Sequence, residues 1–247
     1  GGVHDPIATR HGYHRVVAGA GNGPVYVDSA LAAADTVSGG DGTDILALDA
    51  AATAVTAANV TNFETLRLDT GGLTQDMAVF AATTFTALDV NAAGATTTFS
   101  NVANSVTTLQ NTAGTGTFTV TRLVDGSSNA LNIAAEDTST ASQGATTFTA
   151  VTANNEETIT LTSGSNAAED LTVTTLTSSD LTTLNLVGTA DAIITNAIAS
   201  STALATVDAS GLTGAATVNA SNSNANVTMT AGAGLATFTG GSANDTI

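Results

Sequence analysis

The fold is decided by a six-residue stretch, Phe63-Glu64-Thr65-Leu66-Arg67-Leu68. Its first, fourth and sixth residues are apolar, and the last two are two positions apart, the period of a β-strand with one buried face. Full or partial copies of this spacing start at Phe85, Val106, Glu156, Leu181, Leu204 and Leu235, with Glu156 replacing the first apolar residue of its copy. Where the copies are clearest they recur about every 21–25 residues, a length that suits one turn of a solenoid. We therefore predict an all-β fold, a parallel β-solenoid of the β-helix or β-roll type.

The repeat also predicts which side chains face inward. In each copy the fourth and sixth residues should enter the core, whereas the polar residues beside them should face solvent: Arg67, Asp89, Asn185 and Asp208. A second strand per turn is expected in the segments rich in Thr and Val, namely 96–102, 117–123, 171–176 and 227–230. Residues 125–155 fit the repeat least and suggest an insertion or a bend. The alternative fold is an antiparallel β-sandwich with Thr-rich strands.

Composition restricts the classes of partner. The chain has 247 residues, 21 acidic against four basic residues, a formal net charge of −17, and no cysteine. Such an acidic chain repels phosphate backbones, so no nucleic-acid partner is expected. The lack of cysteine excludes disulfides and thiolate metal sites. No apolar run reaches the length of a membrane-spanning helix, so no transmembrane segment is expected.

A glycine-rich stretch carries the chemistry of a metal site. Residues 39–46, Gly-Gly-Asp-Gly-Thr-Asp-Ile-Leu, match the nonapeptide G-G-x-G-x-D-x-U of RTX proteins. Glycine permits tight turns that expose carbonyl oxygens, and aspartate adds the hard anionic oxygen that Ca²⁺ prefers. Asp35 lies nine residues before Asp44 and is expected at the equivalent place of the preceding turn, while Ile45 is expected to enter the core. The predicted calcium ligands here are Asp35, Gly39, Asp41, Thr43 and Asp44.

Two weaker copies of this motif flank the repeats. Residues 19–25 keep the glycine pattern but have Gly23 where Asp is expected. Residues 240–247 keep both leading glycines, the Asp and the final apolar residue, with Ala243 replacing a glycine. The ligands predicted in this second copy are Gly240, Asn244 and Asp245.

These features divide the chain into four parts. Residues 1–18 are expected to be an N-terminal segment or linker, 19–46 degenerate RTX calcium-binding turns, 47–239 a Thr/Ala-rich solenoid, and 240–247 the start of a further repeat. The chain begins without Met and ends inside a repeat, so we expect it to be a piece of a longer protein.

With these motifs the chain resembles the calcium-dependent RTX-type surface-layer proteins of Caulobacter-type bacteria, from about Asp35 onward. The resemblance rests on 38–46, 63–67, 85–88, 97–102, 207–210 and the terminal Gly-Gly turn. It implies a secreted structural protein, exported by a type I system, that self-assembles into a calcium-stabilised layer on the cell surface. It also implies calcium at Asp41 and Asp44, and lipopolysaccharide docking through a region outside this chain.

Other functions have weaker support in the residues. A zinc site at His4, His11 and His14 lacks an obvious acidic ligand beyond Asp5. A catalytic triad lacks a base elsewhere because all the histidines lie at one end of the chain. Carboxylates for glycoside hydrolysis occur at Asp89, Asp208, 156–157 and 169–170, and the last two pairs could also bind a second calcium. Thr-x-Thr pairs at 117–119, 172–174 and 228–230 resemble ice-binding solenoids. We expect no enzymatic activity. The alternatives are the repeat stalk of an RTX adhesin and the non-catalytic β-roll of an exported hydrolase.

Overall fold

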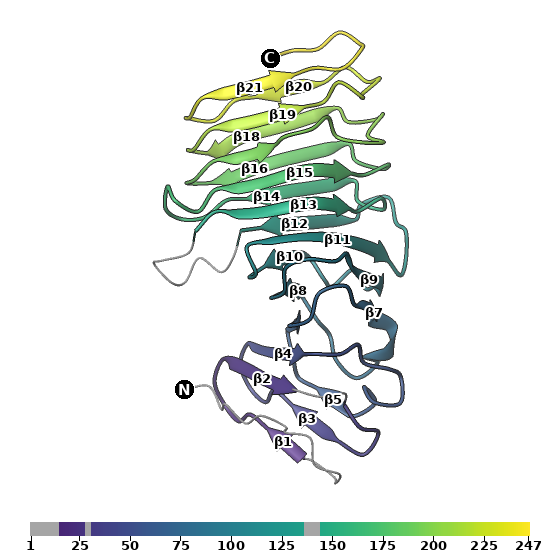
Figure 1. The fold of residues 1–247 in the computed structure, drawn as a ribbon. Coiled ribbons are helices and arrows are strands. Elements are labelled where there is room, and N and C mark those ends of the chain that lie inside the picture. The colour runs from purple at the N-terminus through teal and green to yellow at the C-terminus, as the bar shows by residue number, and fades with distance from the viewer. Residues whose placement is uncertain (1–14, 28–30, 136–143) are drawn as a thin grey trace.

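The chain folds into a parallel β-solenoid of about nine turns, here called rungs (Figure 1). The computed structural model describes residues 15–27, 31–135 and 144–247. Within these ranges every strand pair is parallel, and the single helix is the short 3-10 helix η1 (Met77–Val79). The prediction of a parallel solenoid is thus confirmed, and the antiparallel sandwich is wrong.

Three sheets form the walls. Sheet I has ten strands: β2 (Gly23–Val27), β4 (Asp44–Leu48), β6 (Thr65–Leu68), β8 (Ala87–Val90), β10 (Thr108–Asn111), β12 (Ala130–Ala134), β14 (Thr158–Thr162), β16 (Thr183–Gly188), β18 (Thr206–Leu212) and β20 (Thr228–Thr230). Sheet II has eight: β7 (Thr74–Asp76), β9 (Thr97–Val102), β11 (Thr115–Arg122), β13 (Thr146–Thr152), β15 (Leu171–Thr177), β17 (Ala192–Ile194), β19 (Ala216–Asn219) and β21 (Ala236–Thr239). Sheet III has three: β1 (Arg15–Val17), β3 (Thr36–Ser38) and β5 (Val60–Thr61).

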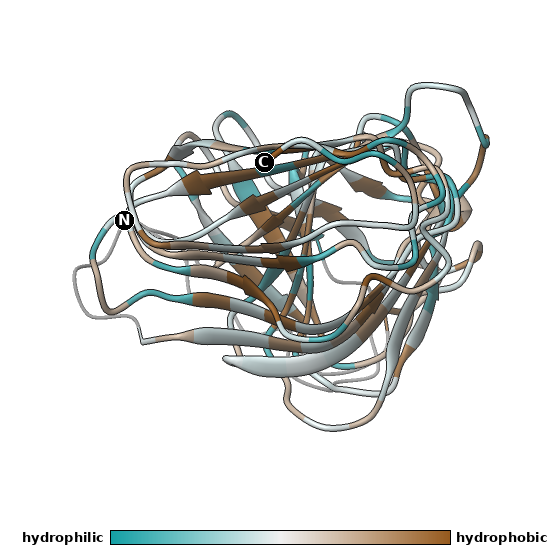
Figure 2. Ribbon diagram, turned by 90° about the horizontal axis from the view of Figure 1, so that it is seen from above, coloured by the Kyte–Doolittle hydropathy of each residue, from teal (hydrophilic) through white to brown (hydrophobic). Residues whose placement is uncertain are grey.

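Apolar side chains stack in columns along the inside of sheet I. Leu46, Leu66, Leu88 and Leu109 are register partners on successive rungs, and each is 0% exposed. Burial of each such side chain contributes roughly 1.5–3 kcal/mol. Figure 2 looks along the stack and shows brown, hydrophobic residues alternating with paler ones on the strands. The fourth position of the repeat therefore builds the core in these copies, as predicted, and the sixth does so at Leu68 and Val90, both 0% exposed.

Between β10 and β12 the apolar repeat moves by two residues relative to the strand pairing of sheet I. Leu109 on β10 pairs with Ile133 on β12 and not with Leu131. Leu131 then starts a second column that continues through Ile159 and Leu184 on the following rungs. The region 125–155, which was predicted to be an insertion or a bend, contains the strands β12 and β13 and a longer connection between them. Residues 136–143 of this connection lie outside the described residues.

Two predictions of side-chain position and two of strand assignment were wrong. Ile45 is only half-buried, whereas its neighbours Asp44 and Leu46 point inward, because the strand begins at Asp44. Asp89 is 3% exposed although it lies on the outer side of sheet I, because the chain after β10 covers it. The copy at Leu235 belongs to β21 in sheet II, and Leu235 is 78% exposed. The segment 227–230 contains β20 of sheet I and is not a second strand, whereas 96–102, 117–123 and 171–176 hold strands of sheet II as predicted.

Carboxylates join neighbouring rungs. Asp170 accepts the backbone N–H of Asp191 at 3.1 Å, and Asp191 accepts that of Ala215 at 2.6 Å. Such charge-assisted bonds satisfy N–H groups at the corners, where the strand ladder stops. These acidic side chains are therefore engaged in holding the corners. In the described ranges, no helix has the length and apolarity that crossing a bilayer requires.

Candidate metal sites

The predicted RTX turn stacks on the glycine pattern one rung earlier. Gly40 has φ of 94° and Gly42 has φ of 140°, values that L-residues with a Cβ rarely adopt. The N–H of Asp41 donates to the carbonyl of Gly19 at 3.2 Å, and the N–H of Gly21 donates to the carbonyl of Asp41 at 2.8 Å. A Cβ on Gly40 would lie 2.1 Å from the Gly19 carbonyl oxygen. The glycines are thus required because two backbone turns touch directly.

Asp44 is the acidic residue that this turn buries. It begins β4 and is 1% exposed. Its Oδ1 accepts the N–H of Gly23 at 3.2 Å, while its Oδ2 is buried and has no hydrogen-bond partner among the described residues. Burial raises the pKa of Asp44, the Gly23 N–H opposes this rise, and the nearby charge of Glu64 adds to it. A carboxylate in this state is one that a cation would stabilise.

A second carboxylate reaches this place from the next rung. Oε2 of Glu64 accepts the N–H of Asp44 at 2.7 Å, and the N–H of Glu64 donates to the carbonyl of Asp44 at 3.1 Å. Glu64 was not among the residues predicted from the glycine motif. It lies 20 residues from Asp44, about one rung, and this spacing is the signal that could have identified it.

The other residues predicted around this turn are spread apart. The side chains of Asp41 and Thr43 are exposed. Asp35 precedes β3 in sheet III, accepts the N–H of Ala32 at 2.8 Å, and is not stacked on Asp44. The register partner of Asp44 on the preceding rung is Gly23, 21 residues away, because one rung is longer than two nonapeptides. The expected equivalence of Asp35 and Asp44 was therefore wrong.

The copy at the C-terminal end has the same local geometry. Oδ1 of Asp245 accepts the N–H of Val227 at 2.8 Å, as Asp44 accepts that of Gly23. The Asp245 carboxylate also lies against Gly240, where a Cβ would be 2.1 Å from Oδ2. The N–H of Asn244 donates to the Asn226 side chain at 3.2 Å. The sequence equivalence of residues 39–46 and 240–247 thus extends to these contacts.

A trio of carboxylates gathers at a corner of the solenoid. Asp125, Glu157 and Asp180 each offer an oxygen within 4.8 Å of the others, and all three are exposed or half-buried. Oε2 of Glu157 accepts the N–H of Asn129 at 2.6 Å. The sequence pattern associates Glu157 only with its neighbour Glu156, so the grouping across three rungs was missed.

The remaining acidic pairs are used internally. Glu156 is fully buried in an ion pair with Arg122, with Nε to Oε1 at 2.6 Å and Nη2 to Oε2 at 2.9 Å. Glu169, 2% exposed, accepts the N–H groups of Ser165 at 2.7 Å and Asn166 at 3.3 Å. Glu156 is therefore already paired with a cation, and Glu169 already accepts backbone N–H groups. The three histidines considered for zinc lie outside the described residues.

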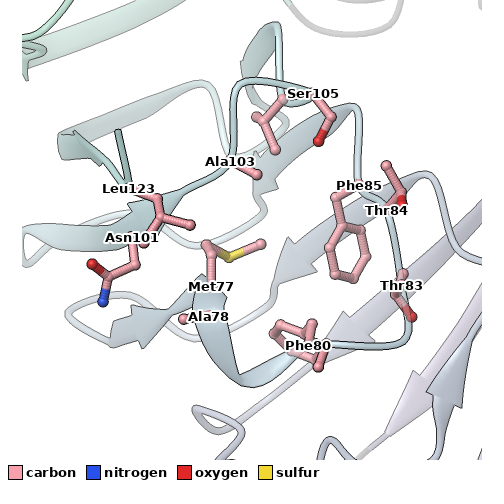
Figure 3. Close-up of a pocket in the computed structure, with 12 residues that line it drawn as sticks. Met77, Ala78, Phe80, Thr83, Thr84, Phe85, Asn101, Ala103, Ser105 and Leu123 are labelled. Carbon is pink, nitrogen blue, oxygen red and sulfur yellow. The ribbon is translucent and has the colours of Figure 1, made fainter. Parts of the chain in front are cut away.

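One open pocket lies where sheet III ends and sheet II begins. It has a volume of about 260 Å³ and is lined by η1, the chain from 80 to 85, and residues 101–106 with Leu123. Figure 3 shows Met77 facing Phe85 across it, and the rings of Phe80 and Phe85 meet edge to face at 5.1 Å. None of the described residues that line it is acidic or basic. Such a lining offers packing surface and weak hydrogen bonding, not proton transfer.

Comparisons with known proteins returned nothing: no family model, no curated protein and no solved structure matches the chain. Every functional conclusion about this chain therefore rests on its own sequence and geometry.

Proposed function

We propose that this chain is a structural module of a secreted bacterial surface-layer protein, and that it self-assembles with other copies into a calcium-stabilised lattice outside the cell. The observation that carries the proposal is the uninterrupted sheet I, whose ten parallel strands run the length of the stack. Each rung contacts chiefly its neighbours, so the molecule is a stiff spacer of repeated units. A spacer of this kind suits a coat in which subunits must hold fixed distances.

Calcium enters the proposal through Asp44. Within the part of the chain that the structure describes, its buried Oδ2 has no partner, and the carboxylate of Glu64 bonds to its backbone. Hard carboxylate and carbonyl oxygens are the ligands that Ca²⁺ takes in six- to eightfold coordination. The net charge of −17 further favours a divalent counter-ion, since repulsion between carboxylates opposes compaction and assembly. When bound, the cation would neutralise this charge at a contact between rungs.

A structural role also agrees with how the polar residues are used. The buried acids Glu156 and Glu169 hold an arginine and a loop, and the carboxylates of Asp170 and Asp191 hold the backbone of the next rung. The described residues that line the pocket beside η1 include no acid or base. These arrangements support stability and not turnover.

The second candidate is the repeat stalk of an RTX adhesin. The same continuous stack favours it, because a stalk needs length and stiffness but no lateral contacts between copies. The two functions differ in self-association, which is therefore the property to measure.

The test is sedimentation together with electron microscopy of the full-length protein that contains this chain, in millimolar calcium and in chelator. Ordered sheets that form with calcium and dissolve in chelator are the expected result. Folded monomers that bind calcium and never assemble would replace the lattice with the stalk. A chain whose circular dichroism, melting temperature and assembly are the same with and without calcium would overturn the calcium dependence itself.

A further inference from the structure

Asp44 Oδ2 is the one charged atom among the buried polar atoms without a partner in the described residues. The other two such atoms are the amide oxygen of Asn111 and the hydroxyl of Ser201. A buried carboxylate oxygen left unpaired is costly when ionised. Asp44 is nonetheless held in place, by the Gly23 N–H on one side and by the strand ladder on the other. Asp44 Oδ2 is therefore a carboxylate oxygen in a fixed orientation that has no bonding partner among the described residues.

The groups around this oxygen are also oxygens. A Cβ placed on Gly39 would lie 3.0 Å from Asp44 Oδ2 and 2.0 Å from the carbonyl oxygen of Asn62. The bare Cα of Gly39 thus allows the carboxylate and a main-chain carbonyl of the next rung to approach the same place. Asn62 itself has a positive φ of 57°, which directs the chain into Glu64 two residues later. The carboxylate of Glu64 then contacts Asp44 from that rung.

We propose that a divalent cation with the ligand preferences of calcium binds between β4 and β6, with Asp44 Oδ2 and the Glu64 carboxylate as its charged ligands. This inference rests on the proposed calcium dependence and locates its ion. The nonapeptide resemblance implies Asp41 as the second charged ligand beside Asp44, within the glycine turn itself; the geometry points to Glu64 in its place. The cation would thus lie between two rungs, and it would connect the glycine turn to the first copy of the repeat.

Glu64 is a better ligand than Asp41 for two reasons. Asp41 is exposed, and both its backbone N–H and its carbonyl are engaged by Gly19 and Gly21 on the preceding rung. Glu64 is half-buried and already bonded to the residue that carries the unpaired oxygen. Two carboxylates supply two of the six to eight oxygens, and carbonyls and water supply the remainder.

The experiment is calorimetric titration of calcium chloride into the chelator-treated 247-residue chain and four variants, followed by melting curves with and without calcium. Glu64→Gln and Asp44→Asn keep an oxygen that accepts the existing backbone bonds and remove only the charge. Asp41→Asn removes an exposed charge in the glycine turn, and Glu157→Gln removes one from the Asp125–Glu157–Asp180 trio. Circular dichroism in chelator checks that each variant folds.

The expected result is a loss of about tenfold or more in the affinity of the tightest site for Glu64→Gln and for Asp44→Asn, with less than about twofold change for the two controls. The calcium-induced rise in melting temperature should shrink in the same two variants. Unchanged binding in Glu64→Gln with weakened binding in Asp41→Asn or Glu157→Gln would overturn the site and leave the calcium-dependent function standing. No calcium binding by the unaltered chain would overturn both.

Discussion

The hydroxyl of Thr112 lies 3.1 and 3.0 Å from the two carboxylate oxygens of Asp89, and the Thr112 N–H donates to one of them at 3.2 Å. The two residues are 23 positions apart, about one rung. Thr112 follows β10, so these bonds fix the chain that leaves sheet I over the outer side of β8. Asp89 also pairs in register with Arg67 on β6, the charged residue that acts on it from that strand. An acidic side chain is thereby buried on the face where a solvated one was predicted.

Burial of Asp89 predicts a stability that rises on mild acidification. Burial raises the pKa of Asp89 from 3.8 to about 6, against the Thr112 bonds and the charge of Arg67, which lower it. As pH rises, Asp89 loses its proton at a lower pH in the unfolded chain than in the folded one. The free energy of unfolding therefore falls by up to about 3 kcal/mol between about pH 4 and pH 6 on account of Asp89. Asp89→Asn should therefore be more stable than the unaltered chain at about pH 7 and equal to it below about pH 4. Urea unfolding in chelator at several pH values measures the difference.

Asp208 provides the matched control on the same outer face. Its hydrogen bonds with Ser210 lower its pKa, so its contribution is present above the pKa of the unfolded chain and is lost as pH falls through the lower folded value. Asp208→Asn should reduce stability at about pH 7, opposite in sign to Asp89→Asn. An Asp89→Asn chain that is less stable at neutral pH than the unaltered one would contradict the first prediction.

The buried pair Arg122–Glu156 predicts a strong coupling between two residues 34 positions apart. Arg122 donates all five of its side-chain N–H groups, two to Glu156 and three to the carbonyls of Ala103, Val106 and Ala130. Glu156→Leu leaves this guanidinium charged and buried, and should cost about 3–5 kcal/mol. The double variant Arg122→Met/Glu156→Leu leaves no unpaired charge and should cost less than the two single changes together. Chemical denaturation of all four chains measures the coupling, and strict additivity would show that the pair acts as two independent groups.

Contact between glycine turns predicts that Gly40 tolerates no side chain. Gly40→Ala combines a left-handed φ with a Cβ placed 2.1 Å from the Gly19 carbonyl oxygen, and should destabilise by about 2 kcal/mol or more. Gly94 has a φ of 118°, and a Cβ added there would have no other atom within 4 Å, so Gly94→Ala carries the backbone cost alone. Melting temperatures of the two variants should separate accordingly. Equal losses would mean that stacking of the two turns contributes nothing.

Local periodicity was sufficient to predict the core of sheet I. Leu66 and Leu68 follow the alternation of a strand, and the same alternation recurs once per rung, so both the strand and the solenoid were visible in sequence. The C-terminal end of the repeat pattern was predicted wrongly. Leu235 imitates the repeat by spacing alone; its copy runs into β21, and its side chain is exposed. A motif of three apolar residues does not encode which sheet its strand joins.

Contacts between rungs were beyond the reach of sequence patterns. The pairing of Arg122 with Glu156, the cover of Thr112 over Asp89 and the approach of Glu64 to Asp44 all depend on rung lengths that vary along the chain. The nine-residue spacing of Asp35 and Asp44 misled for the same reason, since Asp44 stacks on Gly23 and Asp35 precedes a strand of another sheet. The glycine and aspartate pattern predicted where a cation site is expected. The second carboxylate, that of Glu64, could be identified only from the way in which neighbouring rungs stack.

The column of Leu46, Leu66, Leu88 and Leu109 predicts that one leucine supports several rungs. Leu66 is 0% exposed and lies between register partners on both sides. If its side chain were removed, the neighbouring side chains could fill the cavity only in part, because their own strands hold them in place. Leu66→Ala should therefore cost about 2–5 kcal/mol, whereas Leu235→Ala, at a residue 78% exposed, should cost less than about 0.5 kcal/mol. Urea unfolding followed by circular dichroism gives both values. In hydrogen exchange the amides of β4, β6 and β8 should lose protection together in Leu66→Ala, because stability in a solenoid passes through contacts between neighbouring rungs. Loss confined to β6 would show that the rungs unfold independently.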